Sequence, residues 1–226
     1  GASYDEVFTR GRDYSAAIKT TDSGALTMGP VAWGWTEYFY SARDVTDAGA
    51  AWCNTRPDRM AHGHIPCAPW YLQQMSAAST AQGKRLLDYL DIHYYPQGAG
   101  VFSTAAGGAA TQALRLRSTR SLWDPTYTDE SWIGEPVNLI PRMKSWITAN
   151  YPGTKLAITE YSFGAMNSMS GALAQADALG IFGREGVDLA CLWDPPVTTD
   201  PGAQAFRMYL NYDGAGNGFG DTSVSA

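Results

Sequence analysis

Four apolar segments of strand length recur along the chain, and each of them ends in polar or aromatic residues. The clearest is the run at 156–159, which is followed directly by a carboxylate, Glu160. Parallel strands covered by helices on both faces are apolar almost throughout, so we expect Glu160 at the polar mouth of the sheet. In barrel enzymes this mouth is the catalytic end. The alternative is a rim carboxylate held by an Arg or Lys side chain.

The other three segments end in aromatic residues, which predict an aromatic wall beside Glu160. Residues 25–35 end in Trp33 and Trp35, residues 86–96 in His93, Tyr94 and Tyr95, and residues 187–196 in Trp193. Because successive side chains of a strand point to opposite faces, only one of Tyr94 and Tyr95 is expected to face the mouth. One of Trp33 and Trp35 is expected to face the surrounding helices instead.

Helical patterns alternate with these strands. We expect helices at 4–20, 70–82, 135–150, 173–182 and 202–210. A helix followed by four strand–helix pairs is the alternation of a parallel α/β barrel, and eight strands close such a barrel. The fold class is therefore predicted to be α/β, with half of a TIM barrel over residues 1–210 and a tail at 211–226. Four strands leave two open edges that need a partner.

Two long connections interrupt the alternation. Residues 36–66 lack clean periodicity and are predicted to be an irregular insertion, and residues 97–134 are predicted to be a second long loop. Loops of this length inside a compact domain are usually functional. The second loop, which carries Trp132, is expected to cover the site. Arg117 and Arg120 in this loop are expected to hold its backbone and carboxylates rather than a ligand.

Composition excludes several classes of partner. The net charge is −6 and no block of Lys and Arg occurs, which argues against nucleic acid. The chain has 8 Trp and 13 Tyr; most are expected in the core, and the remainder suit flat neutral ligands such as sugars. No apolar run approaches the roughly 20 residues of a membrane span, which predicts a soluble chain without a membrane partner.

The three cysteines form no metal or redox motif. Cys53 and Cys67 could bridge a loop in an oxidising compartment, whereas Cys191 is predicted to be a buried apolar group within a strand. His62 and His64 with these cysteines fit no standard zinc spacing.

A series of short motifs runs along nearly the whole chain. They are Gly-Pro-Val-Ala-Trp-Gly-Trp at 29–35, Arg-Pro-Asp-Arg at 56–59, Ala-His-Gly at 61–63, Trp-Tyr-Leu-Gln-Gln-Met at 70–75, Asp-Ile-His-Tyr-Tyr-Pro at 91–96, Arg-Ser-Thr-Arg-Ser-Leu-Trp at 117–123, Trp-Ile-Gly-Glu at 132–135, Ile-Thr-Glu-Tyr at 158–161 and Asn-Tyr-Asp-Gly at 211–214. In this order they resemble glycoside hydrolase family 44, endo-acting β-1,4-glucanases and xyloglucanases of the retaining clan built on (β/α)8 barrels.

The resemblance implies a catalytic role for Glu160. It implies that the chain is the C-terminal half of the barrel, strands 5–8, with Glu160 as the nucleophile of a double displacement at the end of strand seven. The acid/base Glu would lie upstream of residue 1, about 5–5.5 Å from the nucleophile in the assembled site, so the chain alone is expected to be inactive. No required cofactor is implied. The tail is expected to lead toward a β-sandwich.

The resemblance also implies binding residues and partners. Trp193 and Trp132 would be sugar platforms, and His93 and Tyr161 would hold Glu160, although His93 bonded to a backbone carbonyl is the alternative. Asp44 and Asp47 would offer oxygen ligands to a structural Ca²⁺. The partners would be a β-1,4-glucan and the missing N-terminal half of the barrel, in a secreted enzyme. Other carboxylates, Glu37, Glu130 and Glu135, are expected to be solvated or capping.

Two alternatives to an enzyme remain at this stage. In one, the chain is a non-catalytic β-glucan-binding fragment in which Glu160 is incidental. In the other, it is a half-barrel that assembles with a copy of itself to complete eight strands.

Overall fold

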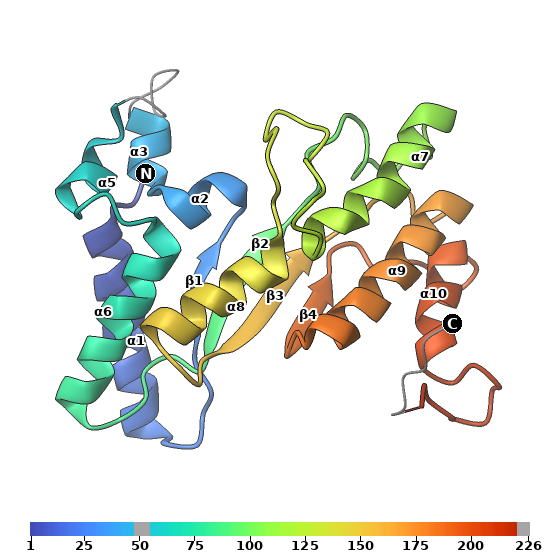
Figure 1. Cartoon of the computed structure of the whole chain (residues 1–226). Coiled ribbons are helices and arrows are strands. Elements are labelled where there is room, and N and C mark those ends of the chain that lie inside the picture. Colours follow the sequence, from blue (N-terminus) through green and yellow to red (C-terminus); the bar gives the residue numbers. More distant parts are fainter. Residues whose placement is uncertain (48–54, 221–226) are drawn as a thin grey trace. The chain divides into compact units, whose positions relative to one another are not determined.

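The computed structural model describes residues 1–47 and 55–220 (Figure 1). The chain divides into two compact units. Unit 1 comprises Gly1–Tyr94, Pro141–Tyr161 and Val187–Cys191, and unit 2 comprises Tyr95–Ile140, Ser162–Gly186 and Leu192–Ala226. None of the helices within the described ranges is long and apolar enough to cross a membrane.

A four-stranded sheet forms the centre of unit 1. Its strands are β1 (Met28–Ala32), β2 (Tyr89–Tyr94), β3 (Lys155–Tyr161) and β4 (Leu189–Leu192), in the spatial order β1-β2-β3-β4 (Figure 1). Strand β2 pairs in parallel with both β1 and β3. The predicted α/β class is confirmed, because each predicted strand is present and neighbours in sequence are neighbours in the sheet, as consecutive barrel strands are.

Helices α1 (Tyr4–Thr21) and α6 (Cys67–Gln82) pack against each other beside β1. A capping box begins α1, since the side chains of Ser3 and Glu6 each accept a hydrogen bond from the other's backbone N–H. Helix α8 (Leu139–Asn150) also contributes to unit 1, where the Gln73 amide of α6 donates a 2.8 Å hydrogen bond to Asn150. The predicted helix start at residue 135 is wrong, because Asn138 has a left-handed φ of 44° that a helix excludes.

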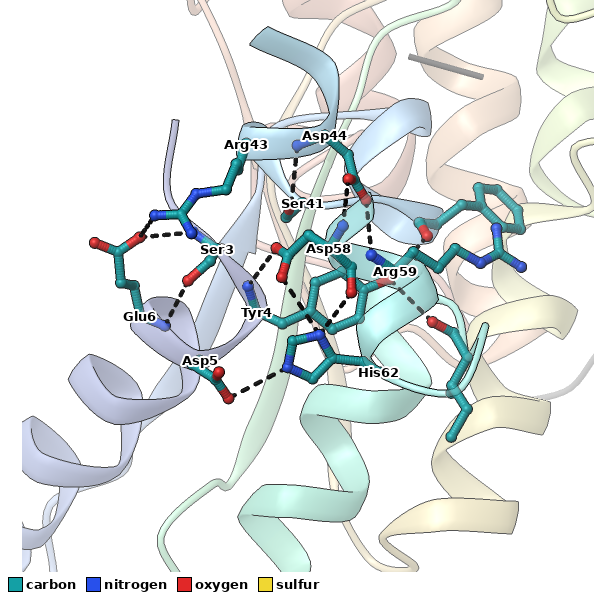
Figure 2. A network of polar contacts seen from close by, with 12 residues as sticks. Ser3, Tyr4, Asp5, Glu6, Ser41, Arg43, Asp44, Asp58, Arg59 and His62 are labelled. Carbon is teal, nitrogen blue, oxygen red and sulfur yellow. Dashed lines mark hydrogen bonds and ion pairs between the residues drawn. The ribbon is translucent and has the colours of Figure 1, made fainter. Parts of the chain in front are cut away.

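The prediction of an irregular insertion at 36–66 is also wrong within the described residues. This segment contains α2 (Trp35–Phe39), α3 (Ala42–Asp47) and α5 (Pro57–Ala61). Helices of five or six residues are too short to show a helical period in sequence. Figure 2 shows how side chains hold them: the buried Asp44 accepts backbone N–H groups of Asp58 at 2.8 Å and Arg59 at 3.0 Å.

Unit 2 is helical and loop-rich. It contains α7 (Ala109–Ser118), η2 (Thr119–Leu122), α9 (Met169–Glu185) and α10 (Pro201–Tyr209), and α9 packs against the other three. The predicted long loop at 97–134 therefore contains a helix that the sequence pattern did not reveal. The tail folds back on itself through a bridge between Leu210 and Gly218, and residues 221–226 lie outside the described part.

The cysteine predictions have different outcomes. The prediction of a buried Cys191 is wrong: β4 lies at an edge of the described sheet, and Cys191 is exposed. Cys67 is buried and has no disulfide partner among residues 1–47 and 55–220. Cys53 lies outside the described residues, so the predicted bridge between Cys53 and Cys67 stays a prediction.

Candidate active site

Glu160 lies near the C-terminal end of β3 in unit 1, beside His93 of β2. The Nδ1 atom of His93 is 3.2 Å from Glu160 Oε2, and 29% of the Glu160 side chain is exposed to solvent. The two residues are register partners because the pairing of β2 with β3 is irregular between Ile92 and His93. The prediction that His93 contacts the Glu160 carboxylate is confirmed.

A second carboxyl group lies next to this pair and was missed by the sequence analysis. Asp91 is buried in β2, and the Thr159 hydroxyl donates a 2.7 Å hydrogen bond to Asp91 Oδ1. Burial raises the pKa of Asp91 above its ordinary value. The available signal was an Asp inside an apolar strand, which the sequence analysis used only as part of a motif.

The aromatic residues that end β1, β2 and β3 are divided between the core and the surface. Tyr94 and Tyr161 are buried in the core of unit 1. Trp33 is half exposed, whereas the ring of Trp35 packs against Phe39 and lies under the guanidinium of Arg142. Trp35 is therefore the tryptophan that faces helices, as expected of one of the pair. The sugar-binding roles of these residues stay predictions.

Unit 2 contains a pocket of about 630 Å³. Its walls include Tyr95, Phe102 and Trp193, and its two charged lining residues are acidic, Asp194 and Asp200. This volume is in the range of small-ligand sites. Of the two adjacent tyrosines at the end of β2, Tyr95 is the one that lines a pocket. An aromatic pocket without a basic side chain suits a neutral ligand that donates hydroxyl hydrogens.

Trp132 is held at the surface of the same unit by Gln97. The indole Nε1–H donates to Gln97 Oε1 at 3.1 Å, and the Gln97 amide donates to the Tyr95 carbonyl at 2.7 Å. Trp132 is 59% exposed. Because the amide nitrogen of Gln97 is engaged, its oxygen is directed to the indole. Gln97, which also lines the pocket, was not singled out from the sequence.

Arg115 joins the loops that form this pocket. It is fully buried, and its guanidinium donates to the carbonyl oxygens of Gly100, Val101, Ala105, Ala106 and Phe163 and to the hydroxyl of Ser170. Burial lowers the pKa of Arg115. The loops approach so closely at Gly164, where φ is +71°, that a Cβ there would lie 2.5 Å from the Ser103 carbonyl oxygen.

Arg117 and Arg120 hold the loop that carries Trp132. Arg117 forms two 2.8 Å bonds to Glu130, and Arg120 contacts Asp124 at 2.7 Å. These contacts and the Tyr127 hydroxyl lower the pKa of Glu130 to about 2. The prediction that both arginines bind loop carboxylates is confirmed. Glu130 is thus a surface carboxylate that forms an ion pair with Arg117.

Glu37 is the capping carboxylate of the two expected alternatives, solvated or capping. It accepts the Trp33 N–H at 2.7 Å, in the first turn of α2, as a capping carboxylate does. It is half-buried, and desolvation raises its pKa to about 7. Glu37 is therefore a capping group with a perturbed proton affinity.

The calcium role of Asp44 and Asp47 stays a prediction. Both carboxylate oxygens of Asp44 accept backbone N–H groups and cap α5 (Figure 2). Nothing is described of the Asp47 side chain. Within residues 1–47 and 55–220, no three His, Cys, Asp or Glu side chains are grouped to hold a metal ion.

Comparison with known proteins relates the chain to one family. The family model of glycoside hydrolase family 44 matches residues 1–98. Endoglucanase A of Paenibacillus lautus is 41% identical over 229 residues, which cover 98% of this chain and 31% of that protein. The match to this relative therefore spans less than a third of its length.

Solved structures resemble the chain over its whole length. CelM2, a bifunctional glucanase-xylanase from a metagenome library, is 49% identical with a TM-score of 0.95, and the match covers 100% of this chain and 43% of that chain. A Paenibacillus polymyxa xyloglucanase from the same glycoside hydrolase family, solved with xyloglucan, is 36% identical with a TM-score of 0.85 and coverages of 99% and 43%. The half-barrel arrangement thus occurs as part of larger chains.

Proposed function

The chain belongs to glycoside hydrolase family 44, and on this premise we propose that it carries the nucleophile of a retaining endo-β-1,4-glucanase. The observation that carries the proposal is the position of Glu160, a half-buried carboxylate at the C-terminal end of β3 with His93 3.2 Å away. Barrel enzymes place their catalytic residues at this end of the strands.

In the proposed reaction a Glu160 oxygen attacks the anomeric carbon of a glucosyl unit. The bond from that carbon to the leaving oxygen breaks, and an acid/base carboxyl protonates the leaving oxygen. Water, deprotonated by the same acid/base, then attacks the anomeric carbon and releases Glu160. We propose that His93, whose Nδ1 lies 3.2 Å from Glu160 Oε2, orients the Glu160 carboxylate for attack. The catalytic acid/base is proposed to come from the part of the family's barrel that these 226 residues do not match.

The proposed ligand is a neutral polysaccharide. The pocket of unit 2 has aromatic walls and acidic hydrogen-bond acceptors, and Trp193 is 53% exposed. Aromatic rings bind the C–H faces of sugars, while carboxylates accept hydrogen bonds from their hydroxyl groups. The relatives' names, which include endoglucanase, glucanase-xylanase and xyloglucanase, support a glucan, with xyloglucan or xylan as further substrates. We propose a β-1,4-linked chain and an extracellular role.

The proposed macromolecular partner is the remaining half of the barrel. In the described sheet, β1 and β4 each have one neighbouring strand. The unpaired backbone N–H and C=O groups of an edge strand can pair with a further strand. We propose that strands from the remaining half of the family's barrel pair with β1 and β4. Solution mass separates this arrangement from self-assembly, since a dimer of the chain alone would support the half-barrel alternative instead.

The proposal is tested by hydrolysis of carboxymethylcellulose. The chain is assayed with the matching N-terminal half supplied, as wild type, Glu160→Gln and the exposed control Glu135→Gln. We expect Glu160→Gln to lower kcat by about 10⁴-fold or more, the scale seen when a nucleophile is removed, and Glu135→Gln to leave it unchanged. Equal cleavage by wild type and Glu160→Gln would end the proposal.

A non-catalytic glucan-binding module is the second candidate, favoured by the aromatic pocket alone. In that case cellohexaose would bind to the chain, while the N-terminal half would restore no hydrolysis.

A further inference from the structure

Strand β3 contains one residue more than β2 at the point where Glu160 lies. Ile92 pairs with Ile158, but the next residue of β2, His93, pairs with Glu160. Thr159 is therefore the extra residue of a β-bulge. With regular pairing, His93 would lie opposite Thr159, and Glu160 opposite Tyr94. The contact between His93 and Glu160 depends on this bulge.

The bulge residue is bonded to Asp91. The Thr159 hydroxyl donates to Asp91 Oδ1 at 2.7 Å, and the Thr159 backbone also hydrogen-bonds to this carboxyl group. The extra residue of a bulge lacks a regular hydrogen-bond partner on the neighbouring strand. The Asp91 carboxyl group takes the place of that partner for Thr159. Asp91 is 1% exposed. A buried carboxyl group is costly unless it is hydrogen-bonded, and here the bonding partner is the bulge itself.

We propose that Asp91 is a positioning residue for Glu160, because it holds the bulge at Thr159 and thereby places the Glu160 carboxylate beside His93. The inference rests on the proposed function of Glu160. A shift of one residue in strand pairing moves side chains to the opposite face of the sheet. Loss of the bond between Asp91 and Thr159 is therefore expected to turn Glu160 away from His93.

A similar pair elsewhere in the sheet provides a matched control. Asp88 accepts the Thr27 N–H at 2.8 Å and the Thr27 hydroxyl at 3.1 Å, and it also contacts Lys19 at 2.7 Å. This pair joins neighbouring segments without a bulge at a catalytic residue. Asp88→Leu is therefore expected to lower stability while leaving the His93 environment intact.

The test is NMR spectroscopy of the His93 ring in the full chain, which has 3 His residues to assign. Glu160→Gln provides the reference spectrum for His93 without the Glu160 carboxylate. We expect Asp91→Leu, which removes the acceptor, and Thr159→Val to move the His93 ring resonances toward that reference, and Thr159→Ser to keep the wild-type positions. In the Glu160→Gln background, Thr159→Val should cause little further shift.

The opposite result is equally clear. If folded Asp91→Leu or Thr159→Val keeps the wild-type His93 resonances, the inference is wrong. Thr159→Val replaces only the hydroxyl by a methyl group, so it carries the test if Asp91→Leu does not fold. In the hydrolysis assay we expect Thr159→Val to lower kcat by about 100-fold, the effect of a displacement of about 1 Å, with KM little changed. Inactivity of the wild type would count against the proposed function, whereas the NMR result decides the role of Asp91.

Discussion

Glu160 and Trp132 are held in place by different means. Glu160 lies within β3, so its direction follows from the register of that strand with β2. Trp132 lies in a segment without regular secondary structure, and its indole is held by Gln97. A strand positions a side chain through its backbone, whereas a loop needs polar side chains to anchor it. A catalytic group tolerates less displacement than a binding group, so a strand is the more suitable support for it.

Arg115 and Arg117 extend this comparison to the loops themselves. Arg115 is fully buried among carbonyl oxygens, whereas Arg117 pairs with Glu130 at the surface. Removal of the buried guanidinium would leave several carbonyl groups without donors, each of them costly. The exposed ion pair is screened by water and contributes little.

The largest expected effect is therefore on stability. We expect Arg115→Met to lower the free energy of unfolding by about 3–5 kcal/mol, and the matched surface change Arg117→Met to lower it by about 1 kcal/mol or less. Urea unfolding followed by circular dichroism measures both. Equal losses would show that Arg115 does not join the pocket loops as described.

The next effect concerns the pocket. We expect Trp193→Ala to weaken cellohexaose binding by about 10-fold, since an aromatic contact contributes up to about 1.5 kcal/mol. Titration calorimetry on the chain measures this affinity. The control is Trp35→Phe, whose ring packs among helices and should affect stability alone. If Trp35→Phe weakened binding as much as Trp193→Ala, the pocket would not be the sugar site.

A smaller effect is expected from the anchor of Trp132. Gln97→Leu should lower cellohexaose affinity by about 5-fold, because a hydrogen bond contributes about 1 kcal/mol. In the Trp132→Phe background, which lacks the indole N–H, Gln97→Leu should have no further effect. Gln112→Leu, which removes an amide bonded to the Gly107 carbonyl, is the matched control. Additive losses in the double variant would refute coupling between Gln97 and Trp132.

The smallest effect is the pH dependence of the free energy of unfolding that Glu37 in unit 1 causes. Its pKa is raised from 4.5 to about 7 in the folded chain, so between these values the folded state keeps a proton that the unfolded state loses. The neutral carboxyl group therefore contributes its full share to the free energy of unfolding below about pH 4.5, and this share falls as the pH rises toward 7. We expect Glu37→Gln to reduce this slope in urea titrations, and Glu130→Gln to leave it unchanged.

The contribution of the sequence can be judged from particular residues. The apolar runs predicted all four strands, and the carboxylate at the end of one run pointed to Glu160 as a candidate site residue. The aromatic ends identified Trp193 and Tyr95, which line one pocket. The short helices α2, α3 and α5 were missed because each has too few residues to show a period.

Local sequence patterns by themselves determined the α/β class, the strands and their order, because hydrophobic period and length depend on residues that are close together in the chain. Only the tertiary structure decided that Thr159 forms a bulge, that Asp91 bonds to it, and that His93 meets Glu160. Asp91 and Thr159 are 68 positions apart. Strand register and loop anchors arise from such distant pairs, and no local pattern encodes them.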